Sequence, residues 1–310
     1  MRSRALFATV LFLVFDLPAV QAQTDWDAVE VRVTSVRGGV HMLTAAGGNM
    51  AVFPGPDGTL VVDADYAEMA DRILDAIRSV ADPTSPSLRF LVNTHWHFDH
   101  TSGNAAFARE GATIIAHEGV RRLLSEDQVM HALGDREVPA APVEARPVIS
   151  FNDQLSLELN GDLVYVVHVP PAHTDGDVIV HFRDANVVHL GDLFFNGRYP
   201  FIDVDNGGNI SGIVAALEDV LAHTLESTLF IPGHGTLADR DGLEAYLDML
   251  RTVRDRVGEL VEQGRTREEV LAARPTADLD ERWVRSPGSG GADFFVGLVY
   301  DGMVKRRPGG

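Results

Sequence analysis

The stretch Asn93–His100, with the sequence NTHWHFDH, constrains this chain more than any other part of it. It places three imidazoles and one carboxylate within six positions, directly after the apolar run Phe90–Val92. The packing of a hydrophobic core does not require that much polar chemistry, and burying it without a bound ion would be costly. The pattern therefore predicts a β-strand that ends in a metal site.

Three later donors have the same setting, because each follows an apolar run and is flanked by glycine or proline. They are His173, Asp192 and His234, and the strands predicted before them end at Val169, Leu190 and Ile231. Strand ends are rigid, and glycine or proline lets the backbone turn sharply enough to aim a donor. The chain has no cysteine, which excludes disulfides, thiolate ligands and a cysteine nucleophile. Imidazole and carboxylate donors favour zinc, with iron and manganese as alternatives.

The order His-x-His-x-Asp-His, then His, Asp and His, resembles the metal-binding set of the metallo-β-lactamase-fold hydrolase superfamily. The resemblance covers nearly the whole chain after residue 22, as far as Gly235. It implies two bound metal ions, usually zinc. Carried onto this sequence, it implies that the first ion is held by His95, His97 and His173, the second by Asp99, His100 and His234, and both by Asp192.

Asp99 is also the candidate catalytic residue. Two metal ions about 3.5–4 Å apart can share a hydroxide at neutral pH, because a bound cation lowers the pKa of water to roughly 7. Asp99 could orient that hydroxide or move a proton. Asp63 follows the strand predicted at 59–62 and is expected to accept a hydrogen bond from a ligand imidazole, which would fix the ring. The alternative for Asp63 is a turn-forming aspartate.

Three residues beyond the bridging aspartate are candidate substrate contacts. Arg198 and Tyr199 belong to a stretch that resembles an exported group of lactamase-like hydrolases, and Asn209 precedes a predicted helix where some lactamases place a substrate-contacting loop. The alternative is that all three are ordinary loop residues. Trp96 and Phe98, between the ligands, are expected to pack away from the metals, with a place in the pocket wall as the alternative.

Strands and helices alternate along the chain in two halves, which implies sheets covered by helices. In the first half, strands are expected within 29–62 and at 90–93 and 113–116, and helices at 67–80, 102–109 and 118–124. In the second half, strands are expected at 155–159, 163–169, 178–182, 186–190 and 229–231, and a helix at 211–225. Two such halves facing each other predict an α/β fold in four layers, αββα, and the resemblance implies that both sheets are mixed.

Residues 23–310 are expected to form one such domain, with a C-terminal helical extension from about 239 to 310. Helices are predicted there at 239–262, 267–273 and 294–305. The segment 125–148 has no clear period and is expected to be a loop or broken helices. A segment of that length is often functional, for example as a lid beside a site.

The N-terminus has the three parts of a secretory signal, namely Arg2 and Arg4, the apolar run 5–15 and the small-residue site Ala19–Ala22. The apolar run is too short to span a bilayer comfortably. Cleavage after Ala22, export to the periplasm or the medium, and no membrane association after cleavage are therefore predicted. An uncleaved anchor is the alternative.

The net charge of −19 argues against a nucleic-acid partner, because such proteins usually carry a basic patch. The expected partner is a small-molecule substrate, and no pattern indicates an oligomeric state. The predicted activity is hydrolysis of a cyclic amide or related ester, with a β-lactam as the leading substrate because such compounds reach the periplasm. A lactonase or a thioesterase of the glyoxalase II type is the closest alternative, since one lactamase subclass has cysteine at the position of Asp192. An iron oxygenase and a non-catalytic metal-binding protein are the remaining alternatives.

Overall fold

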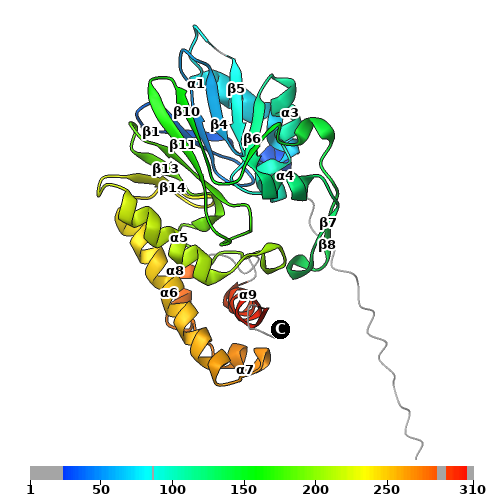
Figure 1. Cartoon of the computed structure of the whole chain (residues 1–310), viewed down its shortest axis with the longest axis vertical. Helices are drawn as coiled ribbons and strands as arrows, with labels where there is room; N and C mark the ends of the chain where they lie inside the picture. The colour runs from blue at the N-terminus through cyan, green and yellow to red at the C-terminus, as the bar shows by residue number, and fades with distance from the viewer. Residues whose placement is uncertain (1–23, 86, 285–290, 306–310) are drawn as a thin grey trace, which may run out of the picture.

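The computed structural model describes residues 24–85, 87–284 and 291–305. The predicted signal peptide, residues 1–22, lies outside the described residues, as do residues 285–290 and 306–310 of the predicted C-terminal extension. Figure 1 shows two sheets packed against each other, with helices on the outer side of each. The predicted four-layer αββα fold is therefore confirmed.

The first sheet has seven strands in the order β1-β2-β3-β4-β5-β6-β9. Strands β1 to β4 pair antiparallel, whereas β4, β5, β6 and β9 run parallel. Because parallel strands point their carboxyl ends to the same edge, the residues that follow β4, β5 and β6 meet there. The strands are β1 (Arg32–Arg37), β2 (Val40–Thr44), β3 (Met50–Phe53), β4 (Thr59–Val62), β5 (Leu88–Val92), β6 (Thr113–His117) and β9 (Ile149–Phe151).

The second sheet has five strands in the order β10-β11-β12-β13-β14. Its first four strands pair antiparallel, and β13 and β14 are parallel because the helix α5 crosses between them. The residues after β13 and β14 therefore share an edge, and this edge carries Asp192 and His234. The strands are β10 (Gln154–Leu159), β11 (Asp162–His168), β12 (Val178–Phe182), β13 (Val187–His189) and β14 (Leu229–Ile231).

Hydrophobic cores hold the layers together. Between the sheets, Val62 and Val92 of the first sheet share a core with Val166 and Val180 of the second. On the outer face of the first sheet, α1 and α3 cover a second core, and on the outer face of the second sheet α5 and α6 cover a third. The helices are α1 (Ala70–Val80), α2 (Phe98–Thr101), α3 (Asn104–Arg109), α4 (Glu118–Leu124), α5 (Ile210–His223), α6 (Arg240–Glu262), α7 (Arg267–Ala272), α8 (Asp280–Trp283) and α9 (Gly291–Lys305).

The C-terminal helices enlarge the outer layer of the second half. α6 packs against both α5 and α9, and the shared core contains Leu217, Leu250 and Val299. The Asp239 side chain caps α6 by accepting a hydrogen bond of 3.1 Å from the backbone N–H of Gly242, which explains why the helix begins at Arg240. Within 24–85, 87–284 and 291–305, no helix has the length and apolar character that crossing a bilayer requires.

The segment 125–148 differs from the sequence prediction. It contains a β-hairpin, here called the 128–138 hairpin, formed by β7 (Gln128–Met130) and β8 (Arg136–Val138). Gly134 and Asp135 have φ angles of 74° and 58°, and this left-handed backbone reverses the chain between the two strands. Strands of three residues are too short to show the alternation that identifies a strand in a sequence. The prediction of a loop or broken helices was therefore wrong for this part.

Other elements were missed or misplaced. Strand β9 was not predicted, for the same reason of length, and β1 begins at Arg32 rather than Val29. The helix predicted from Ser102 is preceded by a separate turn of helix, α2, which already begins at Phe98 inside the ligand cluster. This early helix start is what positions the last two donors of the cluster.

Candidate metal centre

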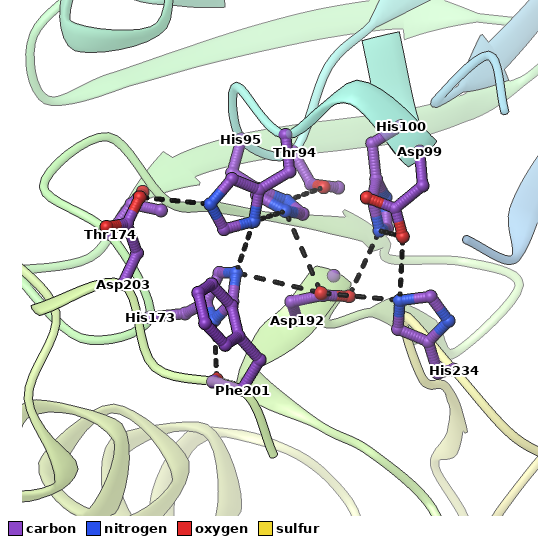
Figure 2. Close-up of polar contacts among 12 residues, drawn as sticks. Thr94, His95, Asp99, His100, His173, Thr174, Asp192, Phe201, Asp203 and His234 are labelled. Atoms are coloured by element: carbon purple, nitrogen blue, oxygen red, sulfur yellow. Dashed lines mark hydrogen bonds and ion pairs between the residues drawn. The ribbon is translucent and has the colours of Figure 1, made fainter. Parts of the chain in front are cut away.

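The chain after β5 changes direction within the ligand cluster. Asn93 and Asn104 exchange two side-chain hydrogen bonds of 3.0 and 2.9 Å, which tie the end of β5 to α3. His97 has extended backbone angles and precedes α2, which contains Asp99 and His100. Because the helix begins there, these last two donors point to a different side from His95, as Figure 2 shows.

The first donor set consists of His95, His97 and His173. The Nδ1 atom of His97 lies 3.1 Å from Nε2 of His95 and 2.9 Å from Nε2 of His173. The Oδ2 atom of Asp192 lies 3.8 Å from Nε2 of His95 and 3.6 Å from Nε2 of His173. These four atoms converge on one point, and the four side chains are buried.

The second donor set consists of Asp99, His100 and His234. The Oδ2 atom of Asp99 lies 3.2 Å from Nε2 of His234 and 3.8 Å from Nε2 of His100. Asp192 reaches this set as well, with Oδ1 at 3.1 Å from Nε2 of His100 and Oδ2 at 3.4 Å from Nε2 of His234. Figure 2 shows Asp192 between the two sets. The structure thus brings all seven predicted donors together, with Asp192 in the position of a bridging ligand.

The donor atoms fit a bound metal. The Nε2 atom of His100 and the Oδ1 atom of Asp192 are buried and lie 3.1 Å from each other, but among the described residues neither makes a well-aligned hydrogen bond. Buried polar atoms satisfied only by such a contact are costly, and a metal ion bound by both would remove that cost. Imidazole and carboxylate donors of this kind are positioned to bind metal ions such as zinc, iron or manganese.

In each imidazole of the first set, the ring nitrogen that does not face the other donors contacts a polar partner. The Nδ1 atom of His95 lies 3.0 Å from Oγ1 of Thr94, and Nδ1 of His173 lies 3.0 Å from the carbonyl oxygen of Phe201. The Nε2 atom of His97 lies 3.0 Å from Oδ2 of Asp203. Partners of this kind fix the tautomer and direction of a metal-binding ring.

Asp63 supports the second set. Its Oδ2 atom lies 2.8 Å from Nδ1 of His100, which is the relationship expected from the sequence.

Asp203 supports the first set, and this role was not predicted from the sequence. It lies at the N-terminus of a single 3-10 turn, Val204–Asn206, and in sequence looks like an ordinary turn residue. Besides His97 it accepts a hydrogen bond of 3.1 Å from Nε1 of Trp96, which explains how the buried indole is satisfied.

The two donor sets differ in protonation. Burial, together with the imidazole of His100, holds the pKa of His95 well below its usual range, and burial and His97 lower the pKa of His173 to about 4. Burial also disfavours protonation of His100, but the carboxylates of Asp192 and Asp63 outweigh it and raise the pKa well above the ordinary value. The pKa of His234 is raised as well, because Asp192 and Asp99 outweigh its burial.

Neighbouring side chains also keep the Asp192 carboxylate ionised. Burial would raise the pKa of Asp192, but the imidazoles of His234 and His100 outweigh it and hold that pKa well below its usual range. In the metal-free protein the first set therefore contains neutral imidazoles at His95 and His173, whereas the second contains imidazolium groups paired with carboxylates.

A cavity of about 880 Å³ opens onto the donors. Its polar lining includes Asp99, Asp192 and His234, and its apolar lining includes Phe98, Met130 and Leu133, Phe201 and Phe294. Two of these apolar residues belong to the 128–138 hairpin segment and one to α9. Phe98 therefore contributes to the pocket wall, whereas Trp96 is packed inside with 1% of its surface exposed.

The three candidate substrate contacts have different surroundings. Arg198 and Tyr199 line the cavity, and the Tyr199 hydroxyl donates a hydrogen bond of 3.0 Å to Asp280. Asn209 is not among the lining residues and is only 5% exposed. Its side chain caps α5 by accepting a hydrogen bond of 2.7 Å from the N–H of Gly212. The structure therefore uses the Asn209 side chain to begin the helix and does not place it in the cavity lining.

Comparison with known proteins decides the family. The model of the metallo-β-lactamase superfamily matches residues 43–261. The chain belongs to the metallo-β-lactamase superfamily. The similarity to a solved metallo-β-lactamase from Pontibacter korlensis, with a TM-score of 0.58 and 18% identity over 72% of this chain and 99% of the other, shows the shared fold.

The curated relatives match this chain over a smaller share of their own length than the solved lactamase does. The 2,4-dinitroanisole O-demethylase subunit alpha of Nocardioides sp. (strain JS1661) is 21% identical over 236 residues, which are 76% of this chain and 67% of the relative. A hydroxyacylglutathione hydrolase of Polaromonas sp. (strain JS666 / ATCC BAA-500) is 31% identical over 147 residues, which are 46% of this chain and 47% of the relative. The chain thus spans about half the length of that hydrolase.

Proposed function

We propose that this superfamily member is an exported, dinuclear zinc hydrolase that opens a cyclic amide or a related ester, with a β-lactam as the first substrate to test. The observation that carries the proposal is the convergence of both donor sets on Asp192. The signal-like residues 1–22 support export, and the net charge of −19 favours a small molecule over a nucleic acid as partner.

The two donor sets and Asp99 would have different roles in hydrolysis. Zinc ions held by the two donor sets would supply a water molecule of lowered pKa and would polarise the carbonyl of the substrate. The side chain of Asp99 is 18% exposed and lines the cavity, whereas that of Asp192 is 4% exposed. Asp99 is therefore the carboxylate that can orient water in the open site and hold or move its proton.

The cavity supports a substrate with an apolar group and one negative charge. Its volume of about 880 Å³ suits a small organic molecule, since ligand sites span roughly 300–1,000 Å³. Among the described lining residues, Arg198 is the only arginine or lysine, and its Nε atom is buried without a hydrogen-bond partner. Because Arg198 lines the cavity, its guanidinium would pair with a carboxylate on the substrate. Phe201 and Phe294 would pack against the apolar group.

A thioester is the second candidate, and a specific observation favours it. The curated relative with 31% identity is named a hydroxyacylglutathione hydrolase. The presence of Asp192, rather than a cysteine, also favours this candidate over one lactamase subclass. A lactone on the same site belongs to the same group of alternatives, because the attacked group is again an ester carbonyl.

A hydrolysis screen tests the proposal. Zinc-loaded protein is assayed with a chromogenic cephalosporin, an acyl thioester and a γ-lactone, each with and without a chelator. We expect chelator-sensitive hydrolysis of the cephalosporin. Hydrolysis of the thioester or lactone alone moves the assignment to the second group. If protein that holds two zinc ions hydrolyses none of these compounds, the enzymatic proposal is overturned in favour of a metal-binding protein. Metal analysis of the protein as purified tests the zinc assignment separately, and one iron per chain overturns it.

Export is tested separately. We expect the protein recovered from the periplasm or the medium to begin at Gln23. A protein that keeps Arg2 and Arg4 at its N-terminus contradicts cleavage and supports an anchor.

A further inference from the structure

The turn Gly47–Asn49, here called the 47–49 turn, belongs to the connection between β2 and β3 and contacts Asp99, His100 and the residues on both sides of His234. The N–H of Gly48 donates a hydrogen bond of 2.9 Å to the carbonyl oxygen of Asp99. The ring of His100 lies directly against Gly48, because a Cβ atom at that position would be 2.1 Å from Cε1 of the ring. The N–H of Asn49 donates a hydrogen bond of 2.7 Å to the carbonyl of Gly233, which precedes His234.

The Asn49 side chain holds the loop that carries His234 on both sides. Its Nδ2 atom donates hydrogen bonds of 2.8 Å to the carbonyl oxygen of Pro232 and 2.9 Å to that of Gly235. Asn49 is 5% exposed, and its own carbonyl oxygen lies 3.0 Å from Nε2 of the buried His189. The loop between β14 and α6 is therefore fixed by a residue that lies more than 180 positions earlier in the chain.

The first donor set has separate support. Thr94, Asp203 and the carbonyl of Phe201 hold His95, His97 and His173, and among the described residues no hydrogen bond joins the 47–49 turn to these three histidines. The turn is itself anchored in the first half of the fold, since the N–H of Gly47 donates a hydrogen bond of 2.9 Å to Asp65. The 47–49 turn is therefore physically separate from the contacts that hold the first donor set.

We infer that the 47–49 turn positions the second donor set and thereby sets the affinity for the second metal ion independently of the first. This inference rests on the proposed two-metal site. Asn49 acts as a positioning residue, because its contacts are with the loop around His234 and not with a reacting atom. Loss of such a supporting hydrogen bond typically lowers metal affinity by about 10–100-fold.

The substitution Asn49→Asp tests the inference with almost no change of shape. It replaces the amide donor by an oxygen, so that an acceptor faces the carbonyl oxygens of Pro232 and Gly235. Asn160→Asp is the matched control, because Nδ2 of Asn160 also donates to two backbone carbonyls, those of Phe53 at 3.1 Å and Gly58 at 2.9 Å, away from both donor sets. Zinc is titrated into the metal-free proteins by calorimetry and by competition with a chromophoric chelator, so no substrate is needed.

We expect two binding steps in the wild type and in Asn160→Asp. In Asn49→Asp the dissociation constant of the second step should rise by about 10–100-fold, while that of the first stays unchanged. If Asn49→Asp does not fold, Gly48→Ala serves in its place, because its methyl group displaces the ring of His100 and should weaken the same step.

Any of three results overturns the inference: an equal loss of zinc affinity in both steps, an unchanged affinity in the second step, or a wild type that binds a single zinc ion. Failure of the proposed hydrolysis is a different result, because it leaves these binding steps as they are. A chain that binds two zinc ions but cleaves no substrate would therefore refute the proposed function and leave the role of the 47–49 turn intact.

Discussion

Asp63 and His100 form a buried pair in which Oδ2 of the carboxylate lies 2.8 Å from Nδ1 of the ring, and neither side chain has exposed surface. The same carboxylate accepts hydrogen bonds of 2.7 Å from both the N–H and the hydroxyl of Thr94, the residue before His95. Asp63 also has a φ angle of 64°, so it makes the turn after β4 as well. Both interpretations considered for Asp63 from the sequence are thus combined in one residue, which supports both donor sets.

Asp63→Asn should lower the affinity for zinc by about 10–100-fold. The amide places an N–H where the carboxylate accepted hydrogen bonds from His100 and Thr94. Competition with a chromophoric chelator measures the affinity. Asp162→Asn is the control, because the Asp162 carboxylate is also buried and accepts two backbone N–H groups, at 2.8 and 2.9 Å, away from the donors. Equal losses in the two variants would show that the effect is one of folding.

Asp99→Ala should lower kcat by at least about 100-fold, because it removes both a metal donor and the carboxylate that handles the proton of water in the cavity. The fold should persist, since the Asp99 side chain is 18% exposed and the pair that it forms with His234 lies at the cavity surface. Hydrolysis rates of zinc-loaded protein and the Tm of metal-free protein check the two parts. A rate close to that of the wild type would remove Asp99 from the catalytic machinery.

The two metal ions should differ in proton release. At pH 6.5, His100 and His234 carry protons in the metal-free protein because their pKa values are raised, and the second ion must displace those protons. His95 and His173 are neutral at that pH, because their pKa values are lowered, to about 4 for His173. Lowering the pH towards 5 should therefore weaken the second binding step and leave His95 and His173 of the first set unprotonated.

Calorimetric titration with zinc in two buffers of different ionisation enthalpy measures this difference. The apparent enthalpy of the second step should change with the buffer, by the equivalent of at least one proton, and that of the first should change less. Equal proton release in both steps would contradict the assignment of charge to the second donor set.

The donors could be predicted from sequence because each is defined locally. An apolar run followed by histidine or aspartate beside glycine or proline identifies a strand end, and the parallel arrangement of β4 with β5 and of β13 with β14 brings those ends to one place. The layers followed from the same alternation of strands and helices. Helices such as α4 and α6 were predicted almost to the residue because their apolar spacing and caps are also local.

Apart from Asp63, the supports of the donors could not be predicted, because they are contacts between distant residues of unremarkable type. Asp203 lies 106 positions from His97, and Asn49 lies 183 positions from Pro232. Neither belongs to a periodic pattern, and each has an ordinary role as a turn residue in the sequence. Asn209 is a related case, since its place beside a predicted helix favoured a substrate contact, and the structure gives its side chain a capping role that was not predicted.

Arg198→Met should remove the preference for substrates that carry a negative charge. The unbranched methionine side chain keeps much of the apolar stem that lies beside Phe195, whose ring centre is 5.2 Å from the guanidinium carbon, but it cannot bind a carboxylate. A hydrogen bond to a charged group contributes about 1.5–3 kcal/mol, which corresponds to roughly 10–100-fold in kcat/KM. The measured quantity is the ratio of kcat/KM for a hydrolysed substrate that carries a carboxylate to that for its methyl ester.

The ratio should favour the carboxylate in the wild type and fall by about 10–100-fold in Arg198→Met, mainly through a higher KM for the carboxylate. Arg136→Met is the matched control, because Arg136 also lies over an aromatic ring of this region, Phe98 at 3.7 Å, but is not among the residues that line the cavity. If the control loses the preference equally, the general positive charge near the cavity is responsible. If the wild type shows no preference, Arg198 does not bind a substrate anion, and its buried Nε atom must be satisfied in another way.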